Sequence, residues 1–108
     1  SRGAPFSMDG LVEQMNGDVE LADEILEIFC EDTEEHLQRM AAAVTGYSFE
    51  AIGHEAQALE GGAMNVRAEI LVHLARDLRR AATRQEQEQA KALIDEMVME
   101  LAAMLQST

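Results

Sequence analysis

Apolar residues recur at steps of three and four along most of this chain, the spacing that places side chains on one face of an α-helix. The longest such run begins after Asp18, a good capping residue, and stops before Gly46, so the pattern predicts a helix from Val19 to Val44. Its expected core positions are Leu21, Ile25, Ile28, Phe29, Leu37, Met40 and Val44. The stretch MDGLVEQM before it is long enough for only a turn or two of helix.

Three further helical runs follow. Ser48 is expected to cap the first, the second begins after Asn65, and Thr83 with Glu86 forms a predicted capping box for the third. Their apolar positions are, in chain order, Ile52, Ala56, Leu59 and Ala63; then Leu71, Leu74, Leu78 and Ala81; then Ala90, Leu93, Ile94, Met97, Leu101, Met104 and Leu105. No stretch alternates in the manner of a β-strand.

Four long amphipathic helices joined by short connections predict an all-α fold, because each apolar stripe can be buried against two neighbours. We expect an antiparallel up-and-down four-helix bundle with a short extra N-terminal helix. The length of 108 residues suits about one domain. Residues 8–108 are assigned to the bundle, and residues 1–7 are expected to be a disordered N-terminal segment or a tag remnant.

Two adjacent glycines, Gly61 and Gly62, weaken the third long helix within HEAQALEGGAMNV. A glycine inside a helix costs about 0.5–1 kcal/mol relative to alanine. At about 100° per residue, the flank and outer face of this helix carry a strip with few large side chains. The strip consists of Gly53, Gln57, Glu60, Gly61 and Met64, with His54 beside it. Nothing on the core face requires Gly61, so the strip predicts close approach by an external partner.

Charge excludes several classes of partner. The formal net charge of -13 repels nucleic acid phosphates and anionic lipid, so neither a nucleic acid nor a membrane is expected as a partner. No apolar run approaches the ~20 residues needed to cross a bilayer, and the N-terminal residues lack the apolar core of a signal peptide. These features predict a cytoplasmic protein that binds another protein.

Few residues favour catalysis or metal binding. Cys30 is the only cysteine, which excludes an internal disulfide and a thiolate zinc cluster, and its position predicts a small buried side chain. His36 and His73 are expected at the surface or its boundary, with no i,i+4 pairing that would build a metal site. The carboxylate runs CEDTEEH and EQEQ are expected on solvated helix faces. We therefore expect no enzyme activity, no metal and no cofactor.

The sequence resembles the histidine-containing phosphotransfer (HPt) domains of bacterial phosphorelays. The resemblance runs from FSMDGLVEQMNGDVELADEILEIFCEDTEEHLQRM through ALEGGAMNVRAEILVHLARDLRRAA. Domains of that family are four-helix bundles whose third segment reads like A-H-x-L-K-G-S-A-x-N-x-G-A, with an exposed, phosphorylated histidine. AQALEGGAMNVRA has the same frame. The resemblance places the acceptor position at Gln57, the lysine of the pattern at Glu60 and its later glycine at Arg67.

These departures change the chemistry that the family would perform. The amide nitrogen of Gln57 cannot act as the nucleophile that a neutral imidazole provides. Glu60, one helical turn away, is expected to repel a phosphoryl group where a lysine would attract it. His54 lies three residues before Gln57, about 60° around the helix and about 4.5 Å along it, so a partner would have to shift to reach it.

The resemblance therefore implies a monomeric HPt-like module that binds a response-regulator receiver domain or a sensor histidine kinase without carrying phosphate. The expected binding residues are Gly53, His54, Gln57, Glu60, Gly61 and Met64. One alternative is an active phosphotransfer intermediate that uses His54, or a chain whose acceptor at Gln57 was replaced deliberately. Another is a purely structural helical interaction domain, which an exposed apolar stripe on a second helix face would favour.

Overall fold

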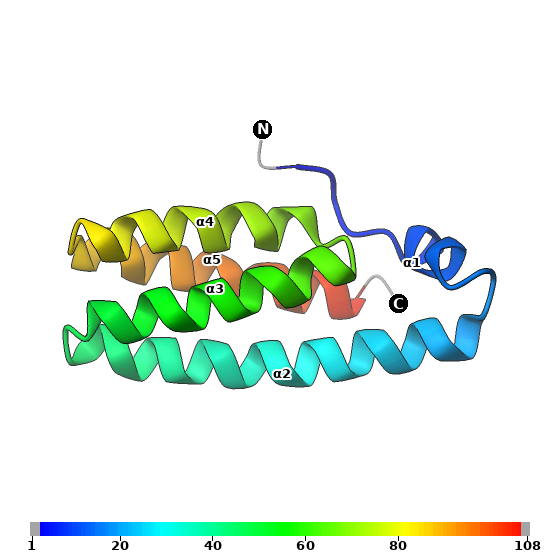
Figure 1. Ribbon diagram of the computed structural model, residues 1–108, viewed down its shortest axis with the longest axis horizontal. Helices are drawn as coiled ribbons and strands as arrows, with labels where there is room; N and C mark the ends of the chain where they lie inside the picture. Colours follow the sequence, from blue (N-terminus) through cyan, green and yellow to red (C-terminus); the bar gives the residue numbers. More distant parts are fainter. Residues whose placement is uncertain (1–2, 107–108) are drawn as a thin grey trace.

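The computed structural model describes residues 3–106 and is all-helical over that range, as the hydrophobic pattern predicts (Figure 1). The helices are α1 (Met8–Gln14), α2 (Val19–Thr45), α3 (Phe49–Asn65), α4 (Glu69–Thr83) and α5 (Gln87–Gln106). Residues 107–108, which the predicted domain includes, lie outside the described residues.

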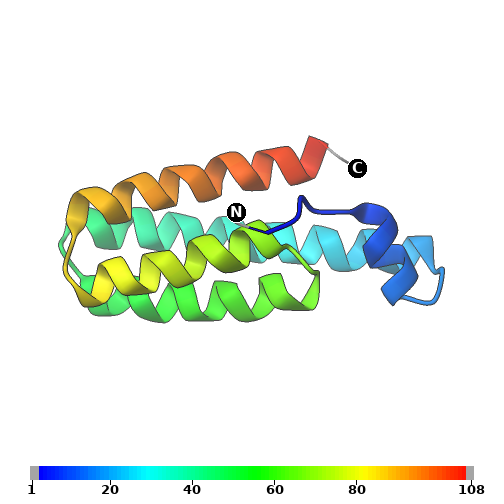
Figure 2. The ribbon, with the colours of Figure 1, turned by 90° about the horizontal axis from the view of Figure 1, so that it is seen from above.

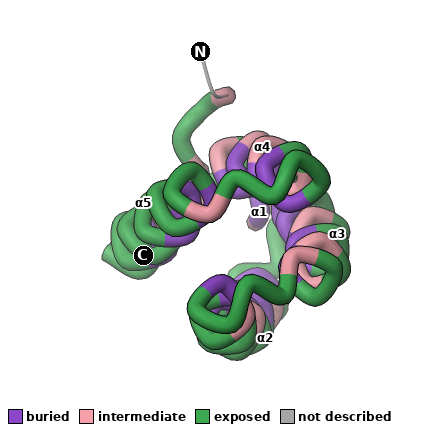
Figure 3. Tube along the Cα trace, turned by 90° about the vertical axis from the view of Figure 1, so that its left-hand side faces the viewer, coloured by how far each residue is buried: buried purple, intermediate pink, exposed green. Residues whose placement is uncertain are grey.

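The four long helices form a ring in which each packs against two others. α2 packs against α3 and α5, and α4 packs against the same two helices, whereas α3 and α5 lie diagonally opposite each other (Figure 3). Consecutive helices run in opposite directions along the long axis of the molecule (Figures 1 and 2). α1 packs against α2 at one end of the ring, where the Gln14 side chain donates a 2.8 Å hydrogen bond to the Asn65 carbonyl. This arrangement leaves an outer face of every long helix open to solvent.

The predicted N-terminal segment, residues 1–7, lies partly outside the described residues, since description begins at Gly3. Gly3 approaches Glu69 at the start of α4 so closely that a Cβ on Gly3 would lie 2.8 Å from the Glu69 Cβ. Phe6 is half-buried and packs against the hydrophobic core. Residues 3–7 thus run from α4 toward α1.

Two of the predicted helix caps need correction. Asp18 caps α2 as expected, because its side chain accepts a 3.0 Å hydrogen bond from the Leu21 N–H. Ser48 precedes α3, but its side chain caps no backbone N–H. The predicted capping box at Thr83 is wrong: Thr83 is the last residue of α4, and its hydroxyl donates to the Arg79 carbonyl. The α5 helix begins only at Gln87.

In the first half of α2, the buried residues differ from those that the sequence predicts. Leu21 and Ile28 were expected to be buried, but they are 40% and 58% exposed, while Leu26 is only 4% exposed. The buried stripe of α2 is Ala22, Leu26, Phe29, Cys30, Thr33, Leu37, Met40 and Val44. The first half of α2 carries two neighbouring apolar stripes. Counting toward the N-terminus from the buried Leu37 in steps of three and four residues leads to the buried stripe, which includes Leu26.

On α5, Leu105 was also expected in the core and is 52% exposed. The remaining predicted core positions of α3, α4 and α5 are buried, among them Ala56, Leu59 and Ala63. Cys30 is buried as its position predicts. The small alanine side chains of α3 face the ring interior, which lets α3 pack closely against its neighbours.

Leu26 and Ile28 provide a matched test of this corrected core. Leu26→Ala should lower the free energy of unfolding by about 2–4 kcal/mol, because it leaves a cavity beside buried neighbours. Ile28→Ala should change it by less than about 0.5 kcal/mol, since the side chain is already mostly hydrated. Urea unfolding followed by circular dichroism measures both values. Equal losses for the two variants would show that the assignment of the α2 stripe is wrong.

Candidate functional site

The outer face of α3 presents the side chains that the sequence singled out. Gln57, Gly61 and Met64 are exposed, Gly53 is half-buried, and Ile52 on the opposite side is fully buried. The burial of the core stripe fixes this rotation of the helix. The structure therefore brings Gln57, Gly61 and Met64 onto one open surface, as the helical spacing predicts.

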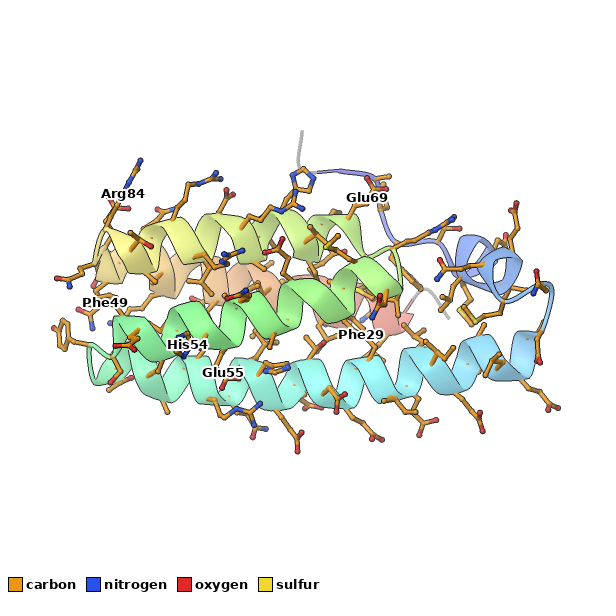
Figure 4. All side chains as sticks on the ribbon, in the orientation of Figure 1. Phe29, Phe49, His54, Glu55, Glu69 and Arg84 are labelled. Carbon is orange, nitrogen blue, oxygen red and sulfur yellow. The ribbon has the colours of Figure 1, made fainter. Side chains whose placement is uncertain are left out.

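His54 lies on the same outer face of α3, one helical turn before Gln57 and nearer the end of the ring. Its side chain is exposed and lines a hollow of about 580 Å³ at the end of the ring, together with Tyr47, Ser48, Phe49, Glu50, Ala51 and Gln85. Figure 4 shows His54 in the half of α3 nearer Phe49. Gln57 does not line this hollow. His54 and Gln57 are three residues apart and therefore neighbours on the helix surface, so a protein bound over one of them also meets the other.

The glycines of α3 differ in what surrounds them. A Cβ added to Gly61 or Gly53 would have no neighbour within 4 Å outside its own stretch of helix. A Cβ added to Gly62 would lie 3.5 Å from the ring of Phe29 on α2, an ordinary packing distance. The missing side chain of Gly61 is therefore not required by the packing of the helices.

Glu60 is the site residue whose surroundings the sequence did not indicate. It points to α4, where its two carboxylate oxygens accept hydrogen bonds from Arg76 Nε at 2.9 Å and from Arg79 Nη1 at 2.8 Å. Its side chain is only 12% exposed. The hydrogen bond from Arg76, and then that from Arg79, hold the pKa of Glu60 below its usual value, although burial opposes them.

This geometry corrects the expectation that Glu60 repels an incoming phosphoryl group. One carboxylate faces two guanidinium groups, so the local charge at this edge of α3 is positive. A hollow of about 410 Å³ along α4 continues the basic surface and is lined by Arg76, Arg79, Arg80, Thr83 and Arg84. The arginines thus supply the kind of charge that the lysine of the family pattern carries.

The other flank of α3 carries a second polar cluster that sequence reasoning missed. Glu55 lies on the α2 side of α3 (Figure 4), where its Oε1 is 2.7 Å from His36 Nδ1 and 3.0 Å from Arg39 Nε. His36 Nδ1 is also 3.1 Å from Arg39 Nη2, so the three side chains form one connected cluster. Burial raises the pKa of Glu55, but the hydrogen bonds from His36 and Arg39 outweigh it and lower the pKa. Neither cluster has a local sequence signature, because the partners are 16 to 19 residues apart.

Arg67, the position of the later glycine in the family pattern, lies in the turn between α3 and α4 with φ of +59°. This left-handed conformation is the one that glycine adopts at least cost. Across residues 3–106, no group of His, Cys, Asp and Glu is arranged to hold a metal ion, and no helix has the length and apolarity needed to cross a membrane.

The ion pairs of Glu60 predict a pH-dependent contribution to stability. A lowered folded-state pKa means that the stabilisation is present above the unfolded pKa near 4.5 and is lost as the pH falls through the folded value. Glu60→Gln should therefore lower the free energy of unfolding by about 0.5–1.5 kcal/mol at pH 7, and the deficit should shrink as the pH falls below 4.5 and through the lowered pKa of Glu60.

Glu35→Gln is the matched control, because Glu35 is exposed and has no ion pair with a described residue. Urea unfolding of both variants between pH 3 and pH 7 measures the effect. A Glu60→Gln deficit of the same size at pH 3 and pH 7 would contradict a role for the carboxylate charge.

Comparison with known proteins identifies the family. The sequence profile of the Hpt domain matches residues 24–107 of this chain. The crystal structure of histidine-containing phosphotransfer protein B (HptB) from Pseudomonas aeruginosa PAO1 is similar, with a TM-score of 0.74 and 29% sequence identity over 94% of this chain and 89% of that one. A search of curated protein sequences gives no match. Because the profile covers the larger part of the sequence, the chain belongs to the Hpt domain family.

Proposed function

We propose that this chain is a phosphorelay module that binds a receiver domain or a histidine kinase through α3 without carrying phosphate itself. The observation that carries the proposal is the exposed glutamine, Gln57, at the position where the family pattern has its phosphorylated histidine. An amide has no free nitrogen lone pair to attack a phosphoryl group. In the proposed role, the chain binds the docking surface of its partner but does not transfer a phosphoryl group.

Two further features support docking at α3. The surface around Gly61 is open, so a partner's backbone or side chains can approach the helix. The arginines bound to Glu60 place positive charge beside Gln57, which favours an acidic partner surface. In this proposal, α2, α3, α4 and α5 form an antiparallel up-and-down four-helix bundle in which the other three helices hold α3 in place. Residues 8–108 form the functional unit, which is a monomer.

The exposure of His54 favours a second candidate, an active phosphotransfer intermediate. His54 has a nitrogen capable of accepting a phosphoryl group, and it is open to solvent. Its place at the end of the ring, within the hollow lined by Tyr47 and Phe49, requires the partner to dock one helical turn away from Gln57. The two candidates therefore predict different phosphorylation behaviour.

Phosphate transfer separates these candidates. We expect no phosphorylation of the unmodified chain by a panel of phosphorylated receiver domains, because Gln57 is inert. Gln57→His should gain an acid-labile phosphoryl group, with Glu60 left in place because Arg76 and Arg79 already provide positive charge.

Phosphate-affinity electrophoresis and mass spectrometry measure the outcome, with His54→Gln as the control. Phosphorylation of the unmodified chain that His54→Gln abolishes would overturn the proposal in favour of the active intermediate. Failure of Gln57→His to accept phosphate from any receiver would argue against docking at this register.

Gly61 tests whether the open surface serves binding. Gly61→Ala should raise the free energy of unfolding by up to about 1 kcal/mol, because alanine favours the helix and its methyl group meets no neighbour. Gly61→Gln should fold normally but weaken binding of a receiver domain by about tenfold or more. Thermal unfolding and isothermal titration calorimetry measure the two effects. Lower stability with unchanged affinity would assign Gly61 to internal packing instead.

A further inference from the structure

The junction between α2 and α5 carries an apolar groove away from α3. Two adjoining hollows of about 370 and 420 Å³ run along it and share Glu34 and Leu105 in their linings. The floor is apolar and includes Leu26, Leu37, Ile94 and Leu101. Val98 and Leu105 stand along the groove with 51% and 52% of their surface exposed. In Figure 3, α2 and α5 are neighbours in the ring, with α3 and α4 on its other side.

The edges of this groove are acidic. The carboxylates that line it are Asp23, Glu27, Glu31 and Glu34 from α2 and Asp95 from α5. None of them forms an ion pair with a described residue, and no basic side chain is part of either lining. The α2 carboxylates are spaced by three and four residues, so they follow one edge of the groove along the helix. An apolar floor therefore lies between unneutralised negative charges.

We infer that the α2–α5 groove binds a basic amphipathic helix of a partner protein. Such a helix would lay an apolar ridge of residues spaced by three and four onto Val98, Leu101 and Leu105. Lysine or arginine side chains on either flank of the ridge would meet the carboxylates of α2 and Asp95. The groove spans Asp23 to Ala41 along α2, a length of about 27 Å that suits a helix of about 18 residues.

A second copy of this chain fits the groove less well. Its net charge of -13 opposes self-association. Four of its eight basic residues lie between Arg76 and Arg84, beside or just after the α3–α4 junction, and two of those are held by Glu60. The groove is also separate from the proposed docking surface, because no residue of α3 lines it. One chain thus offers two separate surfaces to two partners.

A designed peptide tests this inference directly. The probe is an 18-residue helix with leucines spaced by three and four and lysines on both flanks, and its control is a peptide of the same composition in scrambled order. Isothermal titration calorimetry with the full chain should give a dissociation constant on the order of 100 μM or tighter for the probe and no binding for the scrambled peptide. Raising the salt concentration should weaken binding.

Neighbouring positions provide matched variants. Val98→Lys should weaken probe binding about tenfold or more, whereas Met99→Lys, the same change on an exposed side chain outside the groove, should alter it less than about twofold. Glu34→Lys should weaken binding about threefold to tenfold, with Glu35→Lys as its exposed control. Circular dichroism confirms that each variant is folded.

Three results would overturn the inference. The first is no probe binding at millimolar peptide. The second is equal binding of the probe to Val98→Lys and to the unmodified chain. The third is self-association of the unmodified chain in sedimentation experiments that Val98→Lys abolishes, which would assign the groove to a second copy. Because the Gly61 and Gln57 variants leave the groove unchanged, this test can fail while docking at α3 stands, and the reverse also holds.

Discussion

Burial of the α3 apolar stripe is the constraint on which the functional surfaces depend. Ile52, Ala56 and Leu59 must face the interior of the ring, and this fixes the rotation of every other residue of the helix. Glu55 and Glu60 are five residues apart, about 140° around the helix, so they fall on opposite sides of the buried stripe. Glu55 then reaches α2 and Glu60 reaches α4, and each accepts hydrogen bonds from two side chains there.

The same constraint leaves Gln57 and Gly61 exposed on the outer face of α3, between the Glu55 cluster on one side and the Glu60 cluster on the other. A carboxylate buried at the edge of a helix is costly unless it is paired, so the pairs hold α3 at a defined height between its neighbours. Rigid positioning matters for a docking surface because a partner then loses less freedom on binding. The polar clusters therefore help to position the proposed docking surface.

Charge is distributed unevenly over the molecule. The α4 arginines make the α3–α4 side locally basic, while the α2–α5 side is acidic around an apolar groove. The net charge of -13 does not reveal this contrast, because it adds all charges together without regard to where they lie in the structure. The two proposed partners, of opposite charge, would thus be steered toward different faces.

The sequence predicts most of the helices because their apolar periodicity is long and regular. The predictions fail where one helix carries two apolar stripes, as at Leu21 and Ile28, and near a helix end, as at Leu105, where fewer neighbours remain to cover a side chain. Thr83 has the residue type of a cap, but continuation of α4 places it inside the helix.

The open face at Gly61 is likewise foreseeable from spacing alone. The pairing of Glu60 with α4 is not, because a contact between residues 16 and 19 positions apart depends on how two helices align. The register of neighbouring helices is set by all their packed side chains together, and no short motif records it.

The turn at Arg67 changes how the departures from the family pattern should be weighed. Asn16, Tyr47 and Gln85 adopt the same left-handed conformation in the other three connections, so this chain builds all four of its turns with a residue that has a side chain at that position. An arginine in place of glycine there is therefore a matter of local conformational preference, and the backbone path is kept. The two departures from the family pattern are thus different in kind: the one at Arg67 concerns the backbone conformation of a turn, and the proposed one at Gln57 concerns the reactive nitrogen of a side chain. Only the second bears on the proposal that this chain does not carry phosphate.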